Sequence, residues 1–368
     1  MRLLDRYLFR ELLAPLAYCL GGFLVFWLSW DLFNELQGMQ DRKLHLLDVL
    51  EYSAAMTPEF LATILPIALL LALLYALANH ARHNEITAMR AAGASLWRIC
   101  IPYFITGLAL CVVLFALNEY LVPRAAEWAW QIKTRHVPAE EAGQNKFNGF
   151  NNSPADRLWK FDEYRARTAE MVNPAVSQTL PDSTLLELRA SRAAFTNGAW
   201  TFFNASEKEF AQPGARLILS LQTNELAMPE FRETPHQIEV EMKISAYEGV
   251  GKHKADISVS DILSHLRFKG GGPRGDSGWL LTELNSRLAA PWTCLVVVII
   301  AIPFGAGSGR RSLFTGVAGS LFICFAYFLI QKISYAFGVG GHLPAWLAAW
   351  LPNLVFGFAG LWLMTRVK

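Results

Sequence analysis

Few residues in this 368-residue sequence have the types and spacing that catalysis or metal binding requires. The eight histidines are scattered, and His80 and His83 are separated by two residues. That spacing differs from the H-E-x-x-H pattern, which places two zinc ligands on one face of a helix. No G-x-S-x-G nucleophile elbow and no cysteine and histidine metal pattern occurs. We therefore predict no catalytic site and no metal site in this chain.

The string GAGSGRRS (305–312) superficially resembles a phosphate-binding loop. Three residues rather than four separate Gly305 from Gly309, and Arg310 stands where such loops have lysine. We interpret it as a short basic turn between two apolar runs, and we predict no nucleotide site.

The stretch 84–98, NEITAMRAAGASLWR, is the main candidate for a functional element outside the apolar runs. If 85–98 forms a helix, its apolar residues share one face at the i, i+3, i+4, i+7 spacing. These residues are Ile86, Met89, Gly93, Leu96 and Trp97. Two interpretations remain open: a coupling helix that a separate motor protein grips, with Glu85 pairing with a basic residue, or a helix that lies on lipid headgroups.

The composition predicts a membrane protein with a substantial soluble part. The chain is 53% hydrophobic and 17% charged, whereas soluble domains have about 25% charged residues. Six apolar runs are close to the length of about 20 residues that a membrane span needs. They are 12–30, 60–79, 99–117, 288–305, 313–331 and 343–365. The net charge of +2 and the absence of basic runs argue against a nucleic-acid partner.

The distribution of lysine and arginine predicts the orientation of these spans. Basic residues precede the first run, lie between the second and third and between the fourth and fifth, and end the chain. They are Arg2, Arg6, Arg10, Arg82, Arg90, Arg98, Arg310, Arg311, Arg366 and Lys368. We therefore expect both termini in the cytoplasm and the polar middle of the chain outside.

The polar middle reads as an antiparallel β domain, a sandwich or an open β-roll. Short alternating runs occur at 156–164, 184–204, 215–228 and 236–247. Asn197-Gly198 predicts a two-residue hairpin, because a type I′ turn needs positive φ at both positions. The stretch 258–266 reads as a helix, and the glycine-rich stretch 268–278 as a flexible tether. The predicted domains are thus a transmembrane half at 1–121, the β domain at 122–287 and a second transmembrane half at 288–368.

Several strings, taken in order, resemble the LptF/LptG family of lipopolysaccharide-export permeases. NEITAMRAAGAS (84–95) resembles the family's coupling helix, and ELNSRLAAPWTCLVVVIIAIPFG (283–305) the entry into its fourth span. LPAWLAAWLPNLVFG (343–357) resembles the last span, especially that of the LptG branch. The resemblance covers nearly the whole chain. It implies an α-helical membrane protein with six transmembrane helices, three plus three, and an inserted periplasmic β-jellyroll-like domain.

The resemblance also implies a mechanism and a set of partners. A chain of this family binds no cofactor itself and sits in the bacterial inner membrane with a second LptF/LptG-type permease. A dimer of a cytoplasmic ABC ATPase uses ATP and Mg²⁺ to drive it. Lipopolysaccharide is extracted from the outer leaflet and passed to a periplasmic bridge protein with a similar β domain, for assembly of the outer membrane.

Residue roles follow from the resemblance as hypotheses. The residues expected to dock the ATPase are Glu85, Ile86, Met89, Arg90, Gly93 and Leu96. Those expected to meet phosphates or core sugars of the cargo are Lys332, Arg42, Lys43 and Arg287. Charges at membrane depth are candidates for function, although long side chains near the ends of spans also reach water without any such role.

Two other classes of function remain open from the sequence. Three spans plus three spans have inverted topology, as many secondary transporters do, and such a transporter could carry another amphiphile. A membrane-anchored enzyme that modifies envelope lipids would need a convergent acid or base site. Only Asp31, Glu35 and Glu119 near the outer interface could supply it.

Overall fold

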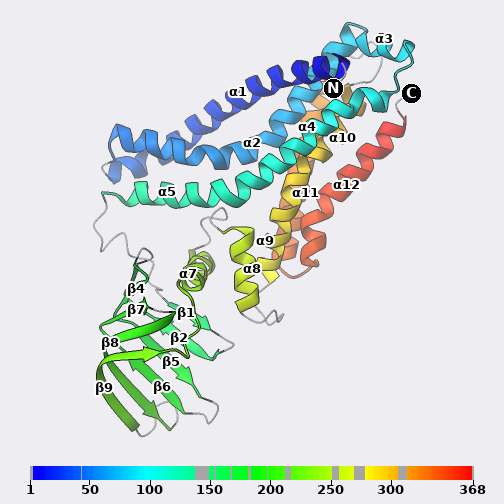
Figure 1. Cartoon of the computed structure of the whole chain (residues 1–368). Coiled ribbons are helices and arrows are strands. Elements are labelled where there is room, and N and C mark those ends of the chain that lie inside the picture. Colours follow the sequence, from blue (N-terminus) through cyan, green and yellow to red (C-terminus); the bar gives the residue numbers. More distant parts are fainter. Residues whose placement is uncertain are drawn as a thin grey trace. The chain divides into compact units, whose positions relative to one another are not determined.

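The structure is a computed structural model. It describes residues 3–42, 44–136, 149–152, 155–165, 168–180, 184–196, 198–211, 217–250, 257–268, 278–305 and 313–366. The chain forms two compact units, Met1–His136 with Pro273–Lys368, and Val137–Gly272. The first unit is helical, and the second contains an antiparallel sheet with two helices (Figure 1).

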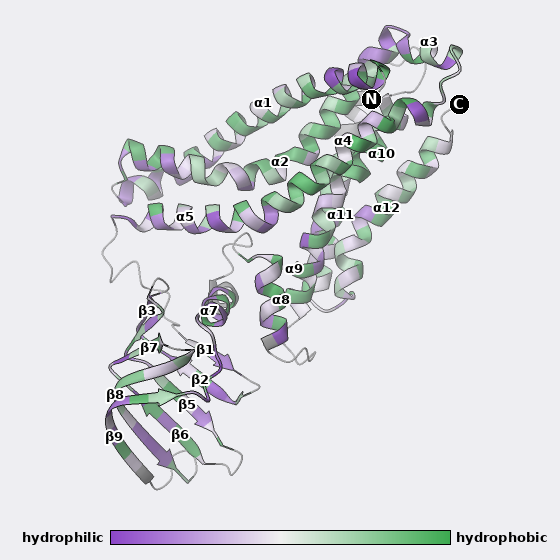
Figure 2. Ribbon diagram, viewed as in Figure 1, coloured by the Kyte–Doolittle hydropathy of each residue, from purple (hydrophilic) through white to green (hydrophobic). Residues whose placement is uncertain are grey.

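Six helical segments in the described part of the chain are long and apolar enough to cross a membrane, as predicted. Figure 2 shows their hydrophobic stretches. The principal helices are α1 (Leu3–Asp41), α2 (Leu46–Arg82), α4 (Leu96–Ala116), α10 (Thr293–Gly305), α11 (Leu313–Val339) and α12 (Ala345–Arg366). Three shorter helices are α3 (Glu85–Ala91), α5 (Val122–Thr134) and α9 (Gly278–Ala289). A π-helical segment, Leu117–Leu121, joins α4 to α5, and a 3₁₀ turn, Ala290–Trp292, joins α9 to α10.

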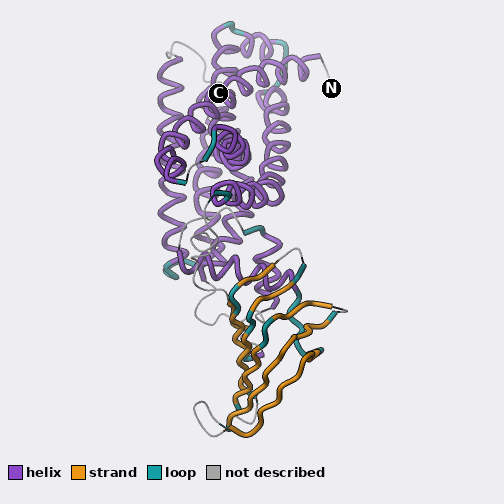
Figure 3. The backbone as a smooth tube through the Cα atoms, turned by 90° about the vertical axis from the view of Figure 1, so that its left-hand side faces the viewer, coloured by secondary structure: helices purple, strands orange, loops and turns teal. Residues whose placement is uncertain are grey.

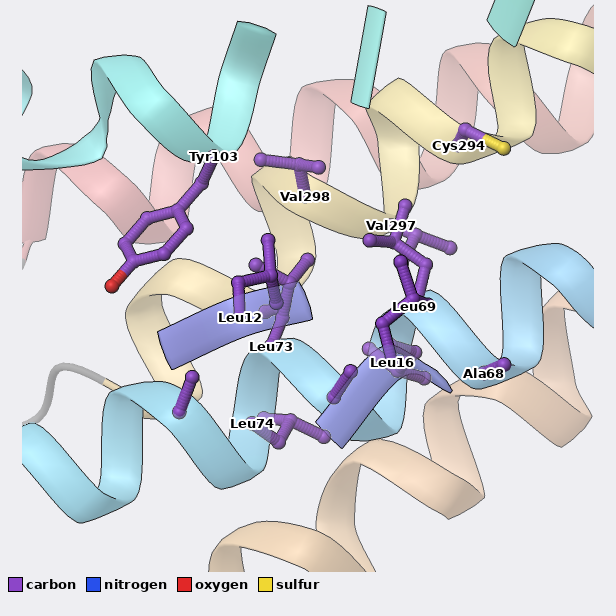
Figure 4. Close-up of a cluster of buried hydrophobic side chains, with 14 of the residues drawn as sticks. Leu12, Leu16, Ala68, Leu69, Leu73, Leu74, Tyr103, Cys294, Val297 and Val298 are labelled. Atoms are coloured by element: carbon purple, nitrogen blue, oxygen red, sulfur yellow. The ribbon is translucent and has the colours of Figure 1, made fainter. Parts of the chain in front are cut away.

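The helices α1, α2, α4 and α10 pack around one apolar core (Figure 4). Leu12 of α1, Leu73 of α2 and Val298 of α10 are all fully buried there. Gly107 lies where α4 crosses α10, and a Cβ added to it would come within 2.7 Å of Val298 Cγ2. Only glycine therefore permits this close helix crossing.

The N-terminal helices continue beyond the predicted spans. At 1.5 Å per residue, the 39 residues of α1 extend about 58 Å, nearly twice the hydrocarbon thickness of about 30 Å. The end of α1 and the start of α2 share a second apolar cluster with α5, which includes Met39 of α1, Tyr52 of α2 and Ile132 of α5. The Lys133 Nζ atom of α5 also lies 2.9 Å from Glu35 Oε1 of α1.

The boundaries between the two units along the chain differ from residues 122 and 287, the predicted limits of the β domain. Residues 122–136 and 278–287 belong to the helical unit. Helix α5 has Pro123 in its first turn, a favourable position for proline. Its polar composition made it read as part of the outer domain, but it packs along α2 instead.

The second unit contains the predicted antiparallel sheet. Its nine described strands are β1 (Gly149–Asn152), β2 (Arg157–Lys160), β3 (Glu163–Arg165), β4 (Glu170–Val172), β5 (Ala175–Thr179), β6 (Leu185–Arg189), β7 (Arg192–Thr196), β8 (Ala199–Phe210) and β9 (Leu217–Met228). Their order is β1-β2-β5-β6-β8-β7-β4-β3, with β9 also paired to β8. Figure 3 shows the strands from the side.

The strand pairs reveal three long strands that each bend once. The first is β2 with β3, the second β4 with β5 and the third β6 with β7. Each half forms hydrogen bonds with a half of the next long strand, so that β2 pairs with β5 and β3 with β4. The bends are aligned: Asn173 N donates to Ser191 O at 3.0 Å, and Ser191 N donates to Phe203 O at 3.1 Å. Asn173 and Asn204 have φ of +49° and +53°, a conformation that asparagine tolerates better than most residues. The aligned bends curl the sheet around its core.

The predicted hairpin at Asn197-Gly198 is confirmed. Thr196 pairs with Ala199 and Phe195 with Trp200, and Gly198 has a φ of +82°. Asn197 itself, like residues 269–277 of the predicted tether, lies outside the described residues.

The prediction of a strand at 236–247 was wrong, because Pro235–Val250 forms a helix, α7. Ile238, Val240 and Ile244 alternate with charged residues, but the helix starts at a capping box. Gln237 N donates to Thr234 Oγ1 at 3.3 Å, and Thr234 N donates to Gln237 Oε1 at 2.8 Å. The helix predicted at 258–266 is confirmed as α8 (Val259–Phe268). Its His265 contacts Glu241 of α7, and both side chains are 3% exposed.

Candidate functional site

Helix α3 connects α2 to α4 and lies at the same end of the helical unit as the N-terminus (Figure 1). The helix covers Glu85–Ala91 only, and not 84–98 as predicted. Gly93 has a φ of +86°, which ends the helix, and Ser95 then caps a new one by accepting a hydrogen bond from Arg98 N. Leu96 therefore belongs to α4 rather than to a continuous amphipathic helix.

The apolar side chains predicted to dock a partner face the core of the helical unit instead. Ile86 is 6% exposed, and Met89 and Leu96 pack against the large apolar cluster. Buried apolar area favours attachment of α3 to its own bundle. The exposed residues in and just after α3 are Thr87, Ala88, Arg90, Ala91, Ala92 and Gly93. Of the predicted docking residues, Arg90 and Gly93 are thus exposed, and Glu85 is partly exposed.

Glu85 lies at the start of α3 and is held by side chains from two other helices. His80 Nδ1 of α2 lies 2.7 Å from Glu85 Oε2, and Tyr7 of α1 donates its hydroxyl to the carboxylate at 3.1–3.2 Å. Burial raises the pKa of Glu85, but the hydrogen bonds from His80 and Tyr7 outweigh it and lower the pKa overall. The carboxylate is 34% exposed, so it remains ionised and accessible at neutral pH.

The His80 ring is buried, and its Nε2 atom has no hydrogen-bond partner. A neutral imidazole with its proton on Nδ1 can donate to Glu85 without leaving a buried N–H group unpaired. With this tautomer, the pair keeps the net negative charge of Glu85.

The four predicted headgroup residues differ in their surroundings. Lys332 in α11 and Arg42 after α1 are exposed, whereas Lys43 lies outside the described residues. Arg287 Nε lies 3.0 Å from Glu283 Oε1, and both side chains are 10% exposed. Tyr335 of α11 donates its hydroxyl to Glu283 Oε2 at 2.7 Å. Arg287 is therefore mostly compensated by an internal carboxylate, and Lys332 and Arg42 are the more accessible cations.

A buried polar network links the C-terminal helices, and the sequence reasoning missed it. Tyr327 OH lies 2.8 Å from Thr293 Oγ1 and 2.8 Å from Asn353 Oδ1. Asn353 Nδ2 donates to Ala289 O at 2.8 Å. The signal was present as Asn353 within an apolar run, but the sequence reasoning considered only ionisable side chains.

A small apolar recess lies beside this network, between α2, α10 and α11. Its lining includes Leu70, Val297 and Phe328. The free space in this recess is much too small for a lipid with several acyl chains.

The curled sheet of the second unit has an aromatic interior. Trp159, Trp200 and Phe202 are fully buried, and Phe231 from the segment after β9 packs against them. Glu233 in the same segment is 0% exposed and pairs with Arg157 of β2 at 3.0 Å. Sequence reasoning missed this pair, because the two residues are 76 positions apart.

Comparison with known proteins agrees with this architecture. The family model described as lipopolysaccharide export system permease LptF/LptG matches residues 6–366. The lipopolysaccharide export system permease protein LptG of Haemophilus influenzae is 22% identical over 317 residues, which is 84% of each chain. LptG of Escherichia coli K12 is 20% identical over 332 residues, 86% of this chain and 84% of its own. The match spans both transmembrane halves and the inserted β domain, so this chain belongs to the LptF/LptG family of permeases.

Proposed function

We propose that this chain is a permease subunit of an ATP-driven transporter that extracts lipopolysaccharide from the outer leaflet of the bacterial inner membrane. The observation that carries the proposal is α3, a short helix between two spans with an accessible surface of small residues and an ionised glutamate. A rigid element of this kind suits docking of a cytoplasmic ABC ATPase dimer, because small side chains allow close approach and Glu85 supplies charge for a basic partner residue.

The orientation follows from the basic residues at the α3 end. Arg6, Arg10, Arg82, Arg90 and Arg98 belong to the inner end of α1, to α3 or to the adjoining helix ends. Under the positive-inside rule this end is cytoplasmic. Both termini then lie in the cytoplasm, and the β domain lies in the periplasm.

The cargo requires a second permease. The apolar recess cannot hold several acyl chains, whereas α1 and α11 expose large apolar side chains, among them Phe26, Phe33 and Phe325. Two such chains facing each other would enclose a wider apolar space. Lys332 and Arg42 would then meet phosphates or core sugars, because cations near the membrane surface attract anionic headgroups.

The β domain would pass the cargo to a periplasmic bridge protein. In the described part of the sheet, β1, β3 and β9 each pair with one neighbouring strand. A strand of this kind has free backbone donors and acceptors, so a similar domain can extend the sheet by strand addition.

The first experiment tests docking by native mass spectrometry of the complex purified through a tag on this chain. We expect two ATPase copies and a second permease with the natural sequence, and loss of the ATPase from Glu85→Arg. Ala91→Trp would also release it, because Ala91 is exposed at the end of α3 and makes no contribution to the Glu85 contacts. Ala17→Trp on the exposed side of α1 is the matched control. Co-purification of the ATPase with both α3 variants would contradict the docking role.

A second experiment tests the cargo role of Lys332. Lys332→Glu should abolish the stimulation of ATP hydrolysis by lipopolysaccharide while leaving basal hydrolysis within about twofold. Unchanged stimulation would remove Lys332 from the headgroup site.

Two other results would support the alternative functions. Ion-driven uptake of an amphiphile in vesicles without any ATPase would support a secondary transporter. Loss of a lipid modification after changes to Asp31, Glu35 or Glu119 would support an enzyme.

A further inference from the structure

The turn between α2 and α3 places a buried histidine against Glu85. His80 lies in the last turn of α2, where the helix dipole favours a positive charge, and it is 1% exposed. Asn84 has a φ of +56°, a conformation that asparagine tolerates, so α3 begins three residues after α2 ends. This tight turn brings His80 Nδ1 to 2.7 Å from Glu85 Oε2.

The hydrogen bond between these two side chains fixes where His80 carries its proton. An ionised carboxylate only accepts hydrogen bonds, so Nδ1 of His80 must be the donor. The other ring nitrogen, Nε2, is buried and has no hydrogen-bond partner in the described part of the chain. Neutral His80 therefore orients Glu85 and leaves its negative charge intact. A second proton, on Nε2, would cancel that charge and place an N–H group where it has no acceptor.

Histidines are the groups near Glu85 whose charge changes close to neutral pH. The side chains that act on Glu85 and lower its pKa are Tyr7, His80 and His83. His83 is exposed, and its Nδ1 atom lies 2.9 Å from Asn79 O of its own helix. The other titratable or charged groups around the pair are Glu11 of α1, Cys100 and Tyr103 of α4, and Arg98 of α4 paired with Asp5 of α1. Of all these groups, only the histidines ordinarily titrate between about pH 5 and pH 8.

We propose that neutral His80 positions Glu85 for docking of the ATPase, and that protonation of His80 weakens docking. The proposal rests on the proposed function, in which an ATPase binds α3 through Glu85. The neutral pair presents one negative charge to a basic residue of the ATPase, whereas the protonated pair presents no net charge. Because linkage is reciprocal, the bound ATPase disfavours protonation of His80 by the same factor. His80 is a positioning residue, since it is buried and acts through Glu85.

The test measures the dissociation constant of the ATPase from the purified pair of permeases as a function of pH. We expect the dissociation constant to rise about tenfold on going from pH 7.5 to pH 5.5, a factor within the usual range for coupled sites. The ATPase has titratable groups of its own, so the comparison is made between permease variants that bind the same ATPase.

Two variants assign the pH dependence to one histidine. In His80→Asn, the side-chain amide can donate as Nδ1 does but does not titrate, so docking should be tight at both pH values. His83→Gln is the matched control, because His83 lies in the same turn but is exposed. This control should keep the pH dependence of the natural sequence. Thermal unfolding at pH 7.5 shows that both variants are folded.

Nuclear magnetic resonance of the natural protein gives a readout that does not depend on the folding of His80→Asn. With ¹⁵N-labelled histidine, the ring signals that shift in Glu85→Gln identify His80. We expect the tautomer with its proton on Nδ1 at pH 7.5. At pH 6, we expect less protonated His80 with the ATPase bound than without it.

Four results would overturn the proposal. They are equal docking of the natural complex at both pH values, an unchanged pH dependence in His80→Asn, loss of that dependence in His83→Gln, and a proton on Nε2 of His80 at pH 7.5. Failure of the natural complex to bind any ATPase at either pH would instead overturn the proposed function itself.

Discussion

Two glutamates at opposite ends of the helical unit are held in similar ways but differ in charge compensation. Glu85 at the α3 end receives a tyrosine hydroxyl from α1 and a histidine from α2. Glu283 in α9 receives a tyrosine hydroxyl from α11 and an arginine from its own helix. Figure 1 shows α3 and α9 at these two ends.

This difference in charge compensation decides which carboxylate keeps a charge that a partner can bind. Arginine is always protonated, so Glu283 and Arg287 together carry no net charge, and both are 10% exposed. Histidine can hold Glu85 in its neutral form, which leaves the pair negative, and Glu85 is 34% exposed. The charge of Glu283 is therefore compensated within the bundle, whereas the Glu85 carboxylate is positioned and still able to attract a cation.

The largest effect should come from removing Arg287. Arg287→Met leaves Glu283 mostly buried without its counter-charge, which should cost about 3–5 kcal/mol of unfolding free energy. Thermal unfolding of the purified protein in detergent would show a clear loss of Tm. Lys332→Met is the matched control, because Lys332 is exposed, and it should stay within about 0.5 kcal/mol. Equal stabilities of the two variants would contradict the claim that Arg287 compensates Glu283.

A smaller effect should separate the two tyrosines. Tyr335→Phe removes a hydrogen bond to a mostly buried carboxylate and should cost about 1.5–3 kcal/mol. Tyr7→Phe should cost about 0.5–1.5 kcal/mol, because Glu85 keeps its contact with His80 and is partly solvated. Thermal unfolding of the two variants under identical detergent conditions compares their losses of unfolding free energy. A greater loss of unfolding free energy from Tyr7→Phe would show that Glu85, rather than Glu283, is the structural carboxylate.

The smallest effect is the pH dependence at Glu85. The pKa of Glu85 lies below its ordinary value of 4.5, so its ionised form contributes stability that is fully present above about pH 4.5. That stability is lost as the pH falls through the ordinary pKa and then the folded-state pKa. Thermal unfolding between pH 6 and pH 3 should therefore show a slope that Glu85→Gln lacks. Identical profiles for both proteins would mean that the contacts with His80 and Tyr7 do not favour the ionised form.

Local patterns predicted those parts of the fold that depend on neighbours in sequence. The six apolar runs became helices because a bilayer requires internally hydrogen-bonded apolar segments. Asn197-Gly198 formed its hairpin because two-residue turns need residues that accept positive φ. The helix at 236–247 could also be predicted from the sequence, since Thr234, Pro235 and Gln237 form a capping signature. The alternation of Ile238 and Val240 with charged residues favoured a strand instead.

The site was predicted only in part. The position of α3 and the hypothesis that Glu85 docks a partner came from the sequence, but the neighbours of Glu85, Tyr7 and His80, did not. Tyr7 is 78 residues from Glu85, and no local period relates them. Likewise, the i, i+4 spacing of Glu283 and Arg287 is visible in the sequence. The contact of Tyr335 with Glu283 is not, because the two residues lie 52 positions apart.

The number of spans, the antiparallel β domain and the family resemblance could be read from the amino-acid sequence, because hydrophobic length, turn chemistry and motif order are local properties. Tertiary structure alone decided which face of α3 is accessible and which cation is compensated. Ile86 and Met89 looked like a docking face, yet they pack on their own bundle, where burial of apolar area is available without a partner. Charge compensation and accessibility depend on side chains that only the fold brings together.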